Sequence, residues 1–332
     1  MGVDPVRPGV ADLGVDQLRL LAKIARMYHE QGIKQPQIAA DLNLSQSRVS
    51  RLLRQAADVG IVRTVVTLPD GVYTDIEQEL ERRYGLLDSV VVDAGRSGEV
   101  MQVLGAAAAP YLVETLTSGD AVGISSWSAT LLATVEAMRP KTGLAVEVVT
   151  QLVGGVGDAH VQVNATRLLD RFATLTGARP LFLPTPGLVQ SPSVRRALFD
   201  DPAVTGVRTA WKRLSVAIVG IGSVQPSPLL QQSGNAIGPE HQQKLHELGA
   251  VGDVCYRFFD RDGKLIRSPF NDRVFGIDPD DLKVVPRRIG VAGGSAKFDA
   301  IAAAIKGGWI NTLVTDLETA GHLLQDRPLP AP

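Results

Sequence analysis

Apolar residues near the N-terminus recur with the 3.6-residue spacing of helices. A first helix is predicted over residues 15–30 by one apolar stripe, made of Leu18, Leu21, Ile24, Ala25 and Tyr28. Two shorter helices follow between Gln35 and Val62. The turn between them falls at Asn43-Leu44, because asparagine tolerates the left-handed backbone that a tight turn needs. The pattern therefore predicts three helices, of which the last two form a helix-turn-helix.

The last of these helices has one apolar face and one polar, cationic face. Ser45 stands where an N-cap belongs, and the core face carries Val49, Leu52, Leu53 and Ala56. The opposite arc carries no acidic residue and matches a recognition helix in the major groove. We expect Ser47, Arg48 and Arg51 to read bases and Arg54 and Gln35 to lie nearer phosphates. The full set of candidate DNA-binding residues is Gln35, Gln46, Ser47, Arg48, Ser50, Arg51 and Arg54. The alternative is an amphipathic helical hairpin with a solvated outer face.

Downstream, the pattern changes to short apolar strands that alternate with amphipathic helices. Residues 63–68 are β-rich and predict a wing strand, and a charged helix over 75–84 predicts a connector. Strands are then predicted over 89–93, 120–124, 146–151, 214–218, 252–256, 288–291 and 312–315. Helices are predicted over 100–116, 129–138, 165–176, 205–212, 239–248, 298–307 and 318–325. This alternation predicts an α/β fold with a mainly parallel sheet that is covered on both faces.

Four segments that follow predicted strands are rich in glycine and serine: residues 125–130, 154–157, 220–223 and 293–297. In a parallel sheet, ligands bind beyond the carboxyl ends of the strands. Small residues let backbone N–H groups approach an anion, and Ser125 and Lys297 could add a hydroxyl and a positive charge. Glycines can also serve only to turn the chain. Residues 220–222 lack the third glycine of a dinucleotide fingerprint, and 293–297 is not a Walker A loop. Together the four segments predict a pocket for a small phosphorylated or polyhydroxylated ligand.

Charge and composition add to this picture. Residues 16–68 hold eight Lys/Arg and four acids, a net of +4, whereas the 332-residue chain has a net charge of −1. We therefore expect a small DNA-facing module on an acidic body. One cysteine and five scattered histidines predict no disulfide, no metal site and no cofactor, and they fit a reducing cytoplasm. No apolar run predicts a membrane span, and residues 1–14 do not have the pattern of a signal peptide.

Two motifs make the chain resemble the SorC-type sugar-binding transcriptional regulators. They are IAADLNLSQSRVSRLLRQAADVGIV near the N-terminus and GVAGGSAKFDAIAAAIKGGWINTLVTDLETAGHLL near the C-terminus. The resemblance implies a winged helix-turn-helix and a Rossmann-like effector domain similar to ribose-5-phosphate isomerase and glucosamine-6-phosphate deaminase. It also implies a homodimer or homotetramer that binds double-stranded operator DNA and is controlled by a sugar, polyol or sugar phosphate. The corresponding domains are a disordered lead-in (1–14), the DNA-binding domain (15–68), a linker helix (69–86) and the effector domain (87–327).

The same resemblance assigns the effector contacts. Together with Ser125 they are Ser126, Ser128, Thr130, Gly154, Gly155, Asp253, Gly294 and Lys297. The family more often has glycine where this chain has Ser128, and position 153 is Val rather than the Lys that an imine with an aldose would need. The competing interpretation is a sugar-phosphate isomerase-like enzyme with an added DNA-binding domain. Such an enzyme needs a carboxylate base, and the corresponding segment offers only Asp158 beside His160, so we expect no catalysis.

Overall fold

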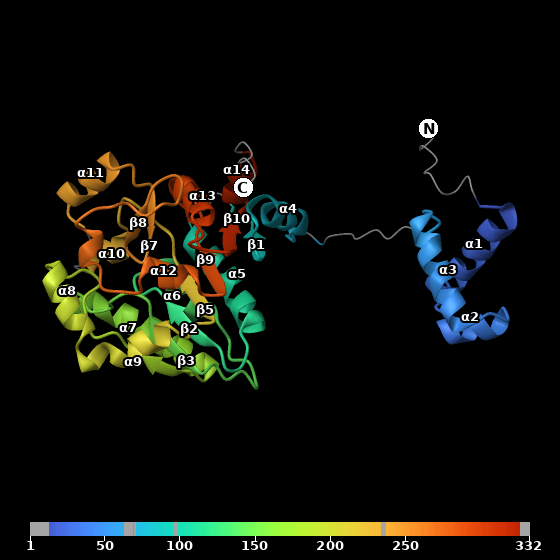
Figure 1. Cartoon of the computed structure of the whole chain (residues 1–332), viewed down its shortest axis with the longest axis horizontal. Coiled ribbons are helices and arrows are strands. Elements are labelled where there is room, and N and C mark those ends of the chain that lie inside the picture. Colours follow the sequence, from blue (N-terminus) through green and yellow to red (C-terminus); the bar gives the residue numbers. More distant parts are fainter. Residues whose placement is uncertain (1–12, 63–68, 70, 96–98, 234–236, 326–332) are drawn as a thin grey trace. The chain divides into compact units, whose positions relative to one another are not determined.

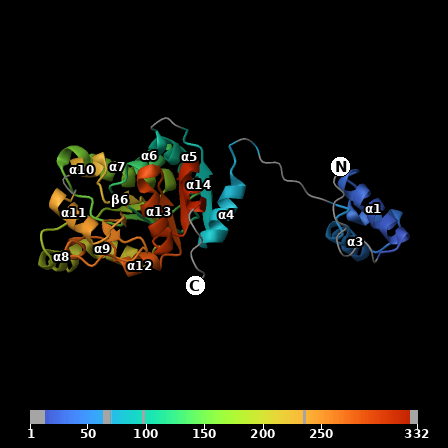
Figure 2. The same ribbon diagram turned by 90° about the horizontal axis from the view of Figure 1, so that it is seen from above.

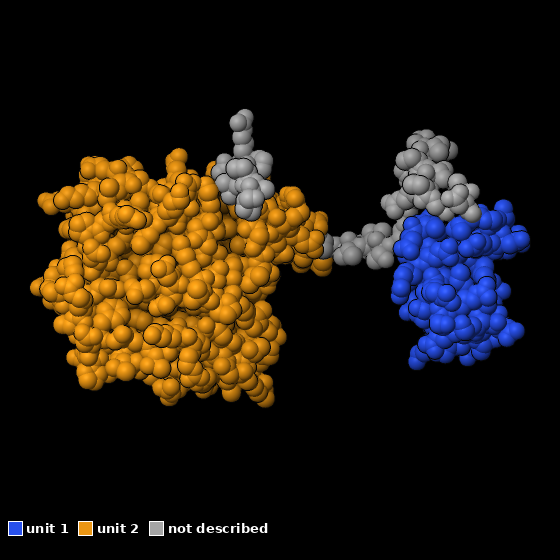
Figure 3. Space-filling model, in the orientation of Figure 1, with its two compact units in different colours: residues 1–67 blue, residues 68–332 orange. Residues whose placement is uncertain are grey.

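The computed structural model describes residues 13–62, 69, 71–95, 99–233 and 237–325 of the chain, without the side chains of 159–161. The chain divides into two compact units, Met1–Thr67 and Leu68–Pro332 (Figure 1 and Figure 3). The predicted wing strand over 63–68 and most of the predicted lead-in lie outside the described residues. In the described part, no helix is long and apolar enough to cross a membrane.

The smaller unit contains three helices, as the apolar spacing predicts: α1 (Val15–His29), α2 (Gln35–Asp41) and α3 (Gln46–Asp58). Their apolar faces meet in one core, in which Leu21, Ile24, Ile38, Val49 and Ala56 are fully buried. Asn43 takes the left-handed conformation, with φ 50°, in the turn between α2 and α3. The three amphipathic stripes therefore pack against one another and leave the polar face of α3 exposed.

The larger unit is built on a seven-stranded parallel sheet with the strand order β1-β10-β9-β5-β2-β3-β4. Its strands are β1 (Asp88–Val92), β2 (Ala121–Ile124), β3 (Val148–Gln151), β4 (Arg179–Leu181), β5 (Val216–Val219), β9 (Arg287–Val291) and β10 (Thr312–Asp316). All the pairs are parallel. β4 is not among the predicted strands. It contains Pro180, which a sheet tolerates at an edge, and β4 is an edge strand.

Helices cover both faces of this sheet (Figure 2). One face packs against α5 (Val100–Thr115), α6 (Ala129–Ala137) and α7 (Ala159–Thr176), and the other against α4 (Thr74–Tyr84), α9 (Pro202–Trp211), α13 (Phe298–Lys306) and α14 (Leu317–Gln325). Successive side chains of a strand point to opposite faces of the sheet. In β5, Ile218 packs on the face covered by α5, α6 and α7, whereas Ala217 and Val219 pack on the other face. The predicted parallel α/β sheet with two covered faces is confirmed.

The strand predicted over 252–256 forms only at residues 252–254, and it lies outside the parallel sheet. A separate antiparallel sheet contains β6 (Gly222–Ser223), β7 (Gly252–Val254) and β8 (Arg257–Phe259). Cys255 and Tyr256 form the turn between β7 and β8, with φ 52° and 63°. A two-residue hairpin with positive φ at both positions usually carries Asn-Gly or Asp-Gly, and Cys-Tyr gives no such signal. The remaining helices are α8 (Pro192–Phe199), α10 (Pro228–Gln232), α11 (Pro239–Glu247), α12 (Pro279–Lys283) and the 3-10 turns η1 (Asn271–Arg273) and η2 (Ser295–Lys297).

The helix that the sequence predicts as a connector, α4, belongs to the larger unit. Its Leu80 is fully buried in the core. The Tyr84 hydroxyl donates a 2.7 Å hydrogen bond to the carbonyl oxygen of Leu323 in α14, and Arg83 donates to that of Leu324. Because α14 lies in the same unit as the sheet, α4 is fixed to the body of the larger unit.

Candidate functional site

The polar face of α3 is organised by its first turn. The Ser45 hydroxyl caps the helix by accepting a hydrogen bond from the backbone N–H of Arg48 over 3.3 Å, as predicted for an N-cap. The capped end is cationic and exposed, and Arg51 donates a long hydrogen bond from Nε to the carbonyl oxygen of Ser47, at 3.4 Å. Among the described residues, Arg48, Arg51 and Arg54 form no ion pair. Three guanidinium groups therefore project from one helix with no acidic partner in the part of the chain that the structure describes.

The structure places the predicted DNA-binding residues on or beside this face. Gln46, Ser47, Arg48, Arg51 and Arg54 are exposed, whereas Gln35 and Ser50 are partly buried. Ser50 and Gln35 are therefore less accessible to a large partner. The exposed five have the donor and acceptor groups that major-groove edges and phosphates accept.

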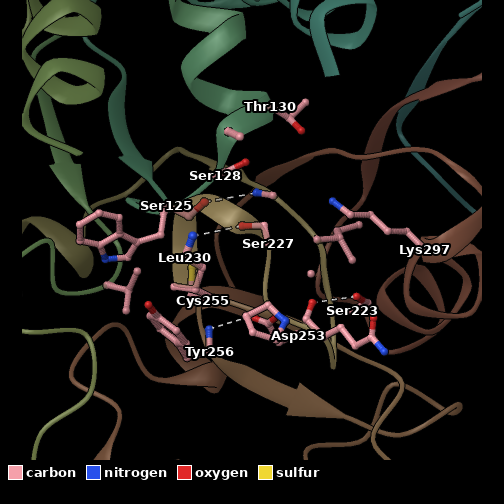
Figure 4. Close-up of a pocket in the computed structure, with 18 of the residues that line it drawn as sticks. Ser125, Ser128, Thr130, Ser223, Ser227, Leu230, Asp253, Cys255, Tyr256 and Lys297 are labelled. Carbon is pink, nitrogen blue, oxygen red and sulfur yellow. Dashed lines mark hydrogen bonds between the residues drawn. The ribbon is translucent and has the colours of Figure 1, made fainter. Parts of the chain in front are cut away.

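A cavity of about 190 Å³ lies at the carboxyl ends of the central strands of the larger unit (Figure 4). It is bounded by the segments after β2, β5 and β9 and by the β7–β8 hairpin. These three strands are neighbours in the order β9-β5-β2, so the segments that follow them converge. The lining comprises Met101, Ser125, Trp127–Thr130, Val153, Gly220–Ser223, Gln225–Ser227, Leu230, Asp253, Cys255, Tyr256 and Lys297. Five predicted contacts, Ser125, Ser128, Thr130, Asp253 and Lys297, are in this set.

Serine hydroxyls from the segment after β2 face the cavity while they also hold its wall together. Ser125 Oγ accepts a hydrogen bond from the backbone N–H of Gly220 at 3.2 Å. Ser128 caps α6 by accepting from the backbone N–H of Leu131, also at 3.2 Å. Among the described residues neither hydroxyl donates a hydrogen bond, so each hydroxyl proton remains available to a ligand. The N-terminus of α6 opens on the same cavity through Ala129 and Thr130, where the helix dipole favours negative charge.

Glycine is required at positions 220 and 222 because other side chains approach the backbone closely at both positions. A Cβ atom at Gly220 would lie 2.6 Å from Ser128 Oγ, and one at Gly222 would lie 2.1 Å from Asp253 Oδ1. Real contacts are never this short, so larger residues would displace the serine or the carboxylate. The glycines of this segment therefore leave room for polar side chains at the cavity wall, and do more than turn the chain.

Asp253 and Lys297 are the two charged residues in the described lining. Burial raises the pKa of Asp253 to about 6, and the hydrogen bond from the backbone N–H of Tyr256 and the charge of Lys297 oppose that change. Burial also lowers the pKa of Lys297, and the charge of Asp253 opposes it. A carboxylate and an ammonium group therefore share one small cavity, and neither is fully solvated.

Four predicted contacts have structural roles and do not line the cavity. Ser126 Oγ donates a 2.7 Å hydrogen bond to the carbonyl oxygen of Val153, and Gly155 packs against the Gln151 side chain. The Gly154 carbonyl accepts from the Trp127 indole at 3.0 Å, and a Cβ there would lie 2.3 Å from the carbonyl oxygen of Pro186. The segment after β3 is therefore covered by residues 185–186. Gly294 donates its N–H to Asp316 Oδ2 at 2.8 Å and so fixes the segment that carries Lys297.

Other lining residues are absent from the predicted set. Ser227, Gln225 and Leu230 come from the start of α10 and the residues before it, and Met101 comes from α5. Tyr256 comes from the hairpin turn that the sequence does not reveal. These residues have no motif spacing, and only the fold brings them to the cavity.

Comparison with known proteins identifies the family. Residues 72–325 match the family model described as "Putative sugar-binding domain". The deoxyribonucleoside regulator of Bacillus subtilis (strain 168) is 34% identical over 313 residues, which cover 94% of this chain and 99% of the relative. The chain belongs to the SorC/DeoR-type family of sugar-binding transcriptional regulators. The resemblance inferred from the two terminal motifs is confirmed.

Other members extend this agreement to the fold. The sorbitol operon regulator of Klebsiella pneumoniae is 29% identical over 316 residues, covering 93% of this chain and 99% of the relative. The crystal structure of full-length SorC from Klebsiella pneumoniae superposes with a TM-score of 0.68 at 27% identity, covering 93% of this chain and all of that one. LsrR of Escherichia coli (strain K12) is 31% identical over 321 residues, covering 95% of this chain and 98% of the relative. These relatives are transcriptional regulators, so this SorC/DeoR-type chain is a regulator and the enzyme interpretation is set aside.

Proposed function

We propose that this regulator binds operator DNA through α3 and that the cavity of its larger unit binds a small sugar-derived effector. The N-terminal unit would act as a winged helix-turn-helix, and the larger unit as a Rossmann-like effector domain of the sugar-phosphate isomerase type. α3 inserts its exposed polar face into the major groove, with Arg51 and Arg48 at base edges and Arg54 at the phosphate backbone. Paired half-sites require two such helices, so the active form is a homodimer or homotetramer.

The observation that carries the proposal is the chemistry of the cavity wall. Hydroxyl groups of Ser125, Ser128, Thr130, Ser223 and Ser227 surround a space that holds one ammonium group, Lys297, and one carboxylate, Asp253. Hydroxyl donors and acceptors suit a polyol or sugar. One cation beside the N-terminus of α6 suits one phosphate group and not two. The effector we propose is therefore a sugar, polyol or sugar monophosphate.

The names of the relatives narrow the compounds to test. One relative is named a deoxyribonucleoside regulator and another a sorbitol operon regulator, so pentose and hexitol derivatives are the first candidates. Binding would favour one arrangement of the subunits and so change the affinity for the operator. The size of that change is limited by the difference in effector affinity between the two arrangements.

A thermal-shift panel tests the proposal directly. The panel contains D-ribose 5-phosphate, 2-deoxy-D-ribose 5-phosphate, D-sorbitol 6-phosphate, D-fructose 6-phosphate and their unphosphorylated forms. At least one compound should raise the melting temperature of the full-length protein and change its retardation on operator DNA. Lys297→Ala should remove the shift caused by a phosphorylated compound, because the ammonium group is lost.

The matched control is Lys264→Ala, since Lys264 is an exposed lysine outside the cavity lining. It should leave every shift unchanged. If no compound in the panel stabilises the parent protein, the proposed effector class is wrong. If a phosphorylated compound shifts the melting temperature of Lys297→Ala and of the parent equally, its phosphate group binds at another site.

A further inference from the structure

The β7–β8 hairpin presents its two turn residues to the cavity in an unfavourable backbone conformation. Cys255 and Tyr256 both have positive φ, at 52° and 63°, although neither is glycine or asparagine. Side chains larger than that of glycine are rare in this region, and such strain persists only where the surroundings impose it. Both residues line the cavity that we propose for the effector. The strain therefore occurs at the wall of a candidate binding site.

The Tyr256 side chain is almost completely enclosed, with 4% of its surface exposed. Its ring is packed tightly, because a Cβ atom on Gly187 would lie 2.8 Å from Tyr256 Cε2. Its hydroxyl group is buried and has no hydrogen-bond partner among the described residues. A buried hydroxyl without a partner destabilises the free protein, whereas a phenyl ring of the same shape would not.

The chemistry of this hydroxyl is that of a neutral donor. Burial and the neighbouring Asp253 raise the pKa of Tyr256 well above its ordinary value, so the phenol keeps its proton. Figure 4 shows the Tyr256 ring on the side of the cavity away from Thr130 and the N-terminus of α6. A ligand with its anionic group at that helix would direct its other end toward the hairpin.

We infer that Tyr256 is a specificity-determining residue of this cavity, and that its hydroxyl bonds an oxygen at the end of the effector remote from α6. This inference rests on the proposed binding of a sugar-derived effector. The unsatisfied hydroxyl is retained because the ligand supplies its partner. A compound without an oxygen at that end leaves the hydroxyl buried and unpaired, and the site discriminates against it.

The test compares two tyrosine variants of the full-length protein. Tyr256→Phe removes a hydroxyl that has no internal partner, so the melting temperature of the free protein should stay unchanged or rise by about 2–4 °C. The dissociation constant of the compound that stabilises the parent in the panel should rise about tenfold. Tyr111→Phe is the matched control, because Tyr111 donates a 2.8 Å hydrogen bond to Asp88 Oδ2 and lies outside the cavity lining. It should lower the melting temperature and leave the dissociation constant unchanged.

The possible outcomes distinguish the inference about Tyr256 from the proposed binding of a sugar-derived effector. A lower melting temperature for free Tyr256→Phe would show an internal partner for the hydroxyl and overturn the inference. Equal dissociation constants for Tyr256→Phe and parent would also overturn it, while the sugar effector would stand. If no compound in the panel binds the parent protein, the proposed sugar effector is refuted, and the inferred contact of Tyr256 with that effector is refuted too.

Discussion

Gly222 lies directly opposite Asp253 in the antiparallel β6–β7 pair, and a Cβ atom on Gly222 would stand 2.1 Å from Asp253 Oδ1. The carboxylate therefore occupies the space that a side chain at position 222 would fill. Its other oxygen, Oδ2, accepts a 2.9 Å hydrogen bond from the backbone N–H of Tyr256. The absence of a side chain at Gly222 in β6 and the hydrogen bond from the turn after β7 together fix the orientation of the Asp253 carboxylate at the cavity wall.

Gly222→Ala should therefore impair effector binding without unfolding the protein. The new methyl group forces the Asp253 carboxylate to rotate, and a hydrogen bond to a charged group contributes about 1.5–3 kcal/mol. The expected result is an effector dissociation constant at least about tenfold higher, measured by isothermal titration. The matched control is Gly206→Ala in α9, where a Cβ would meet no atom within 4 Å. It should stabilise the helix by about 0.5–1 kcal/mol and leave binding unchanged. Unchanged binding for Gly222→Ala would show that the orientation of Asp253 does not matter.

Local patterns predict the small unit well because its core is formed by neighbouring helices. The stripe containing Leu21 and the capped helix after Ser45 are both visible as spacing along the chain. The β7–β8 hairpin is different, because its turn residues, Cys255 and Tyr256, are not typical turn formers. Both take a positive φ, and the Tyr256 ring packs against Gly187, which is far away in sequence. Sequence spacing contains no signal for such a contact.

The position of the cavity follows from a general rule about parallel sheets, but the rule does not define which segments line the cavity. Segments after parallel strands meet at one edge of the sheet, so Ser125, Ser128 and Lys297 were expected to converge. The rule does not say which segment is covered. Gly154 is packed against the backbone of Pro186, so the segment after β3 supplies only Val153 to the cavity. That cover is a tertiary contact and could not be inferred from the glycines themselves.

Asp253 should make the stability of the free protein depend on pH. Burial raises its pKa from 3.8 to about 6, so between these values the folded protein binds a proton that the unfolded chain releases. The contribution of this residue to folding stability therefore falls as pH rises from about 4 to about 6, and stays low above that. Asp253→Asn cannot titrate and lacks this dependence.

Urea unfolding at pH 4.5 and pH 7 measures the difference. The free energy of unfolding of the parent relative to Asp253→Asn should be lower at pH 7 than at pH 4.5. If the free energy of unfolding of the parent relative to Asp253→Asn is the same at both pH values, or is higher at pH 7, then Asp253 titrates near its ordinary pKa or below it. Asp299→Asn, which replaces an exposed carboxylate in α13, serves as the control for a general charge effect.

Ser128 has two roles that substitutions can separate. As the N-cap of α6 it contributes about 1 kcal/mol relative to alanine, whereas glycine at an N-cap costs only a few tenths. Ser128→Ala should therefore lower the melting temperature more than Ser128→Gly. Both variants lose the hydroxyl that faces the cavity, so both should weaken effector binding to a similar extent.

A distant cap provides the comparison for Ser128. Ser191 caps α8 by accepting from the backbone N–H of Val194 at 3.3 Å, and it lies outside the cavity lining. Ser191→Ala should lower the melting temperature and leave effector binding intact. If Ser128→Gly binds the effector as tightly as the parent, the hydroxyl serves only the helix.

Arg51 is the residue of α3 whose loss should most affect operator recognition. It is exposed, forms no ion pair among the described residues and lies one turn beyond the capped end of the helix. A bidentate contact from arginine to a guanine contributes about 1–3 kcal/mol, so Arg51→Ala should weaken binding to the operator by about 5–150-fold. Gel-shift titration on a DNA site selected from a random library by the parent measures this loss. Arg26→Ala, which removes a guanidinium paired with Glu30 in α1, should have a much smaller effect. The thermal shift caused by the effector should be the same for both variants and the parent, because the cavity lies in the other unit. Equal weakening by Arg51→Ala and Arg26→Ala would instead point to a general electrostatic attraction that does not depend on α3.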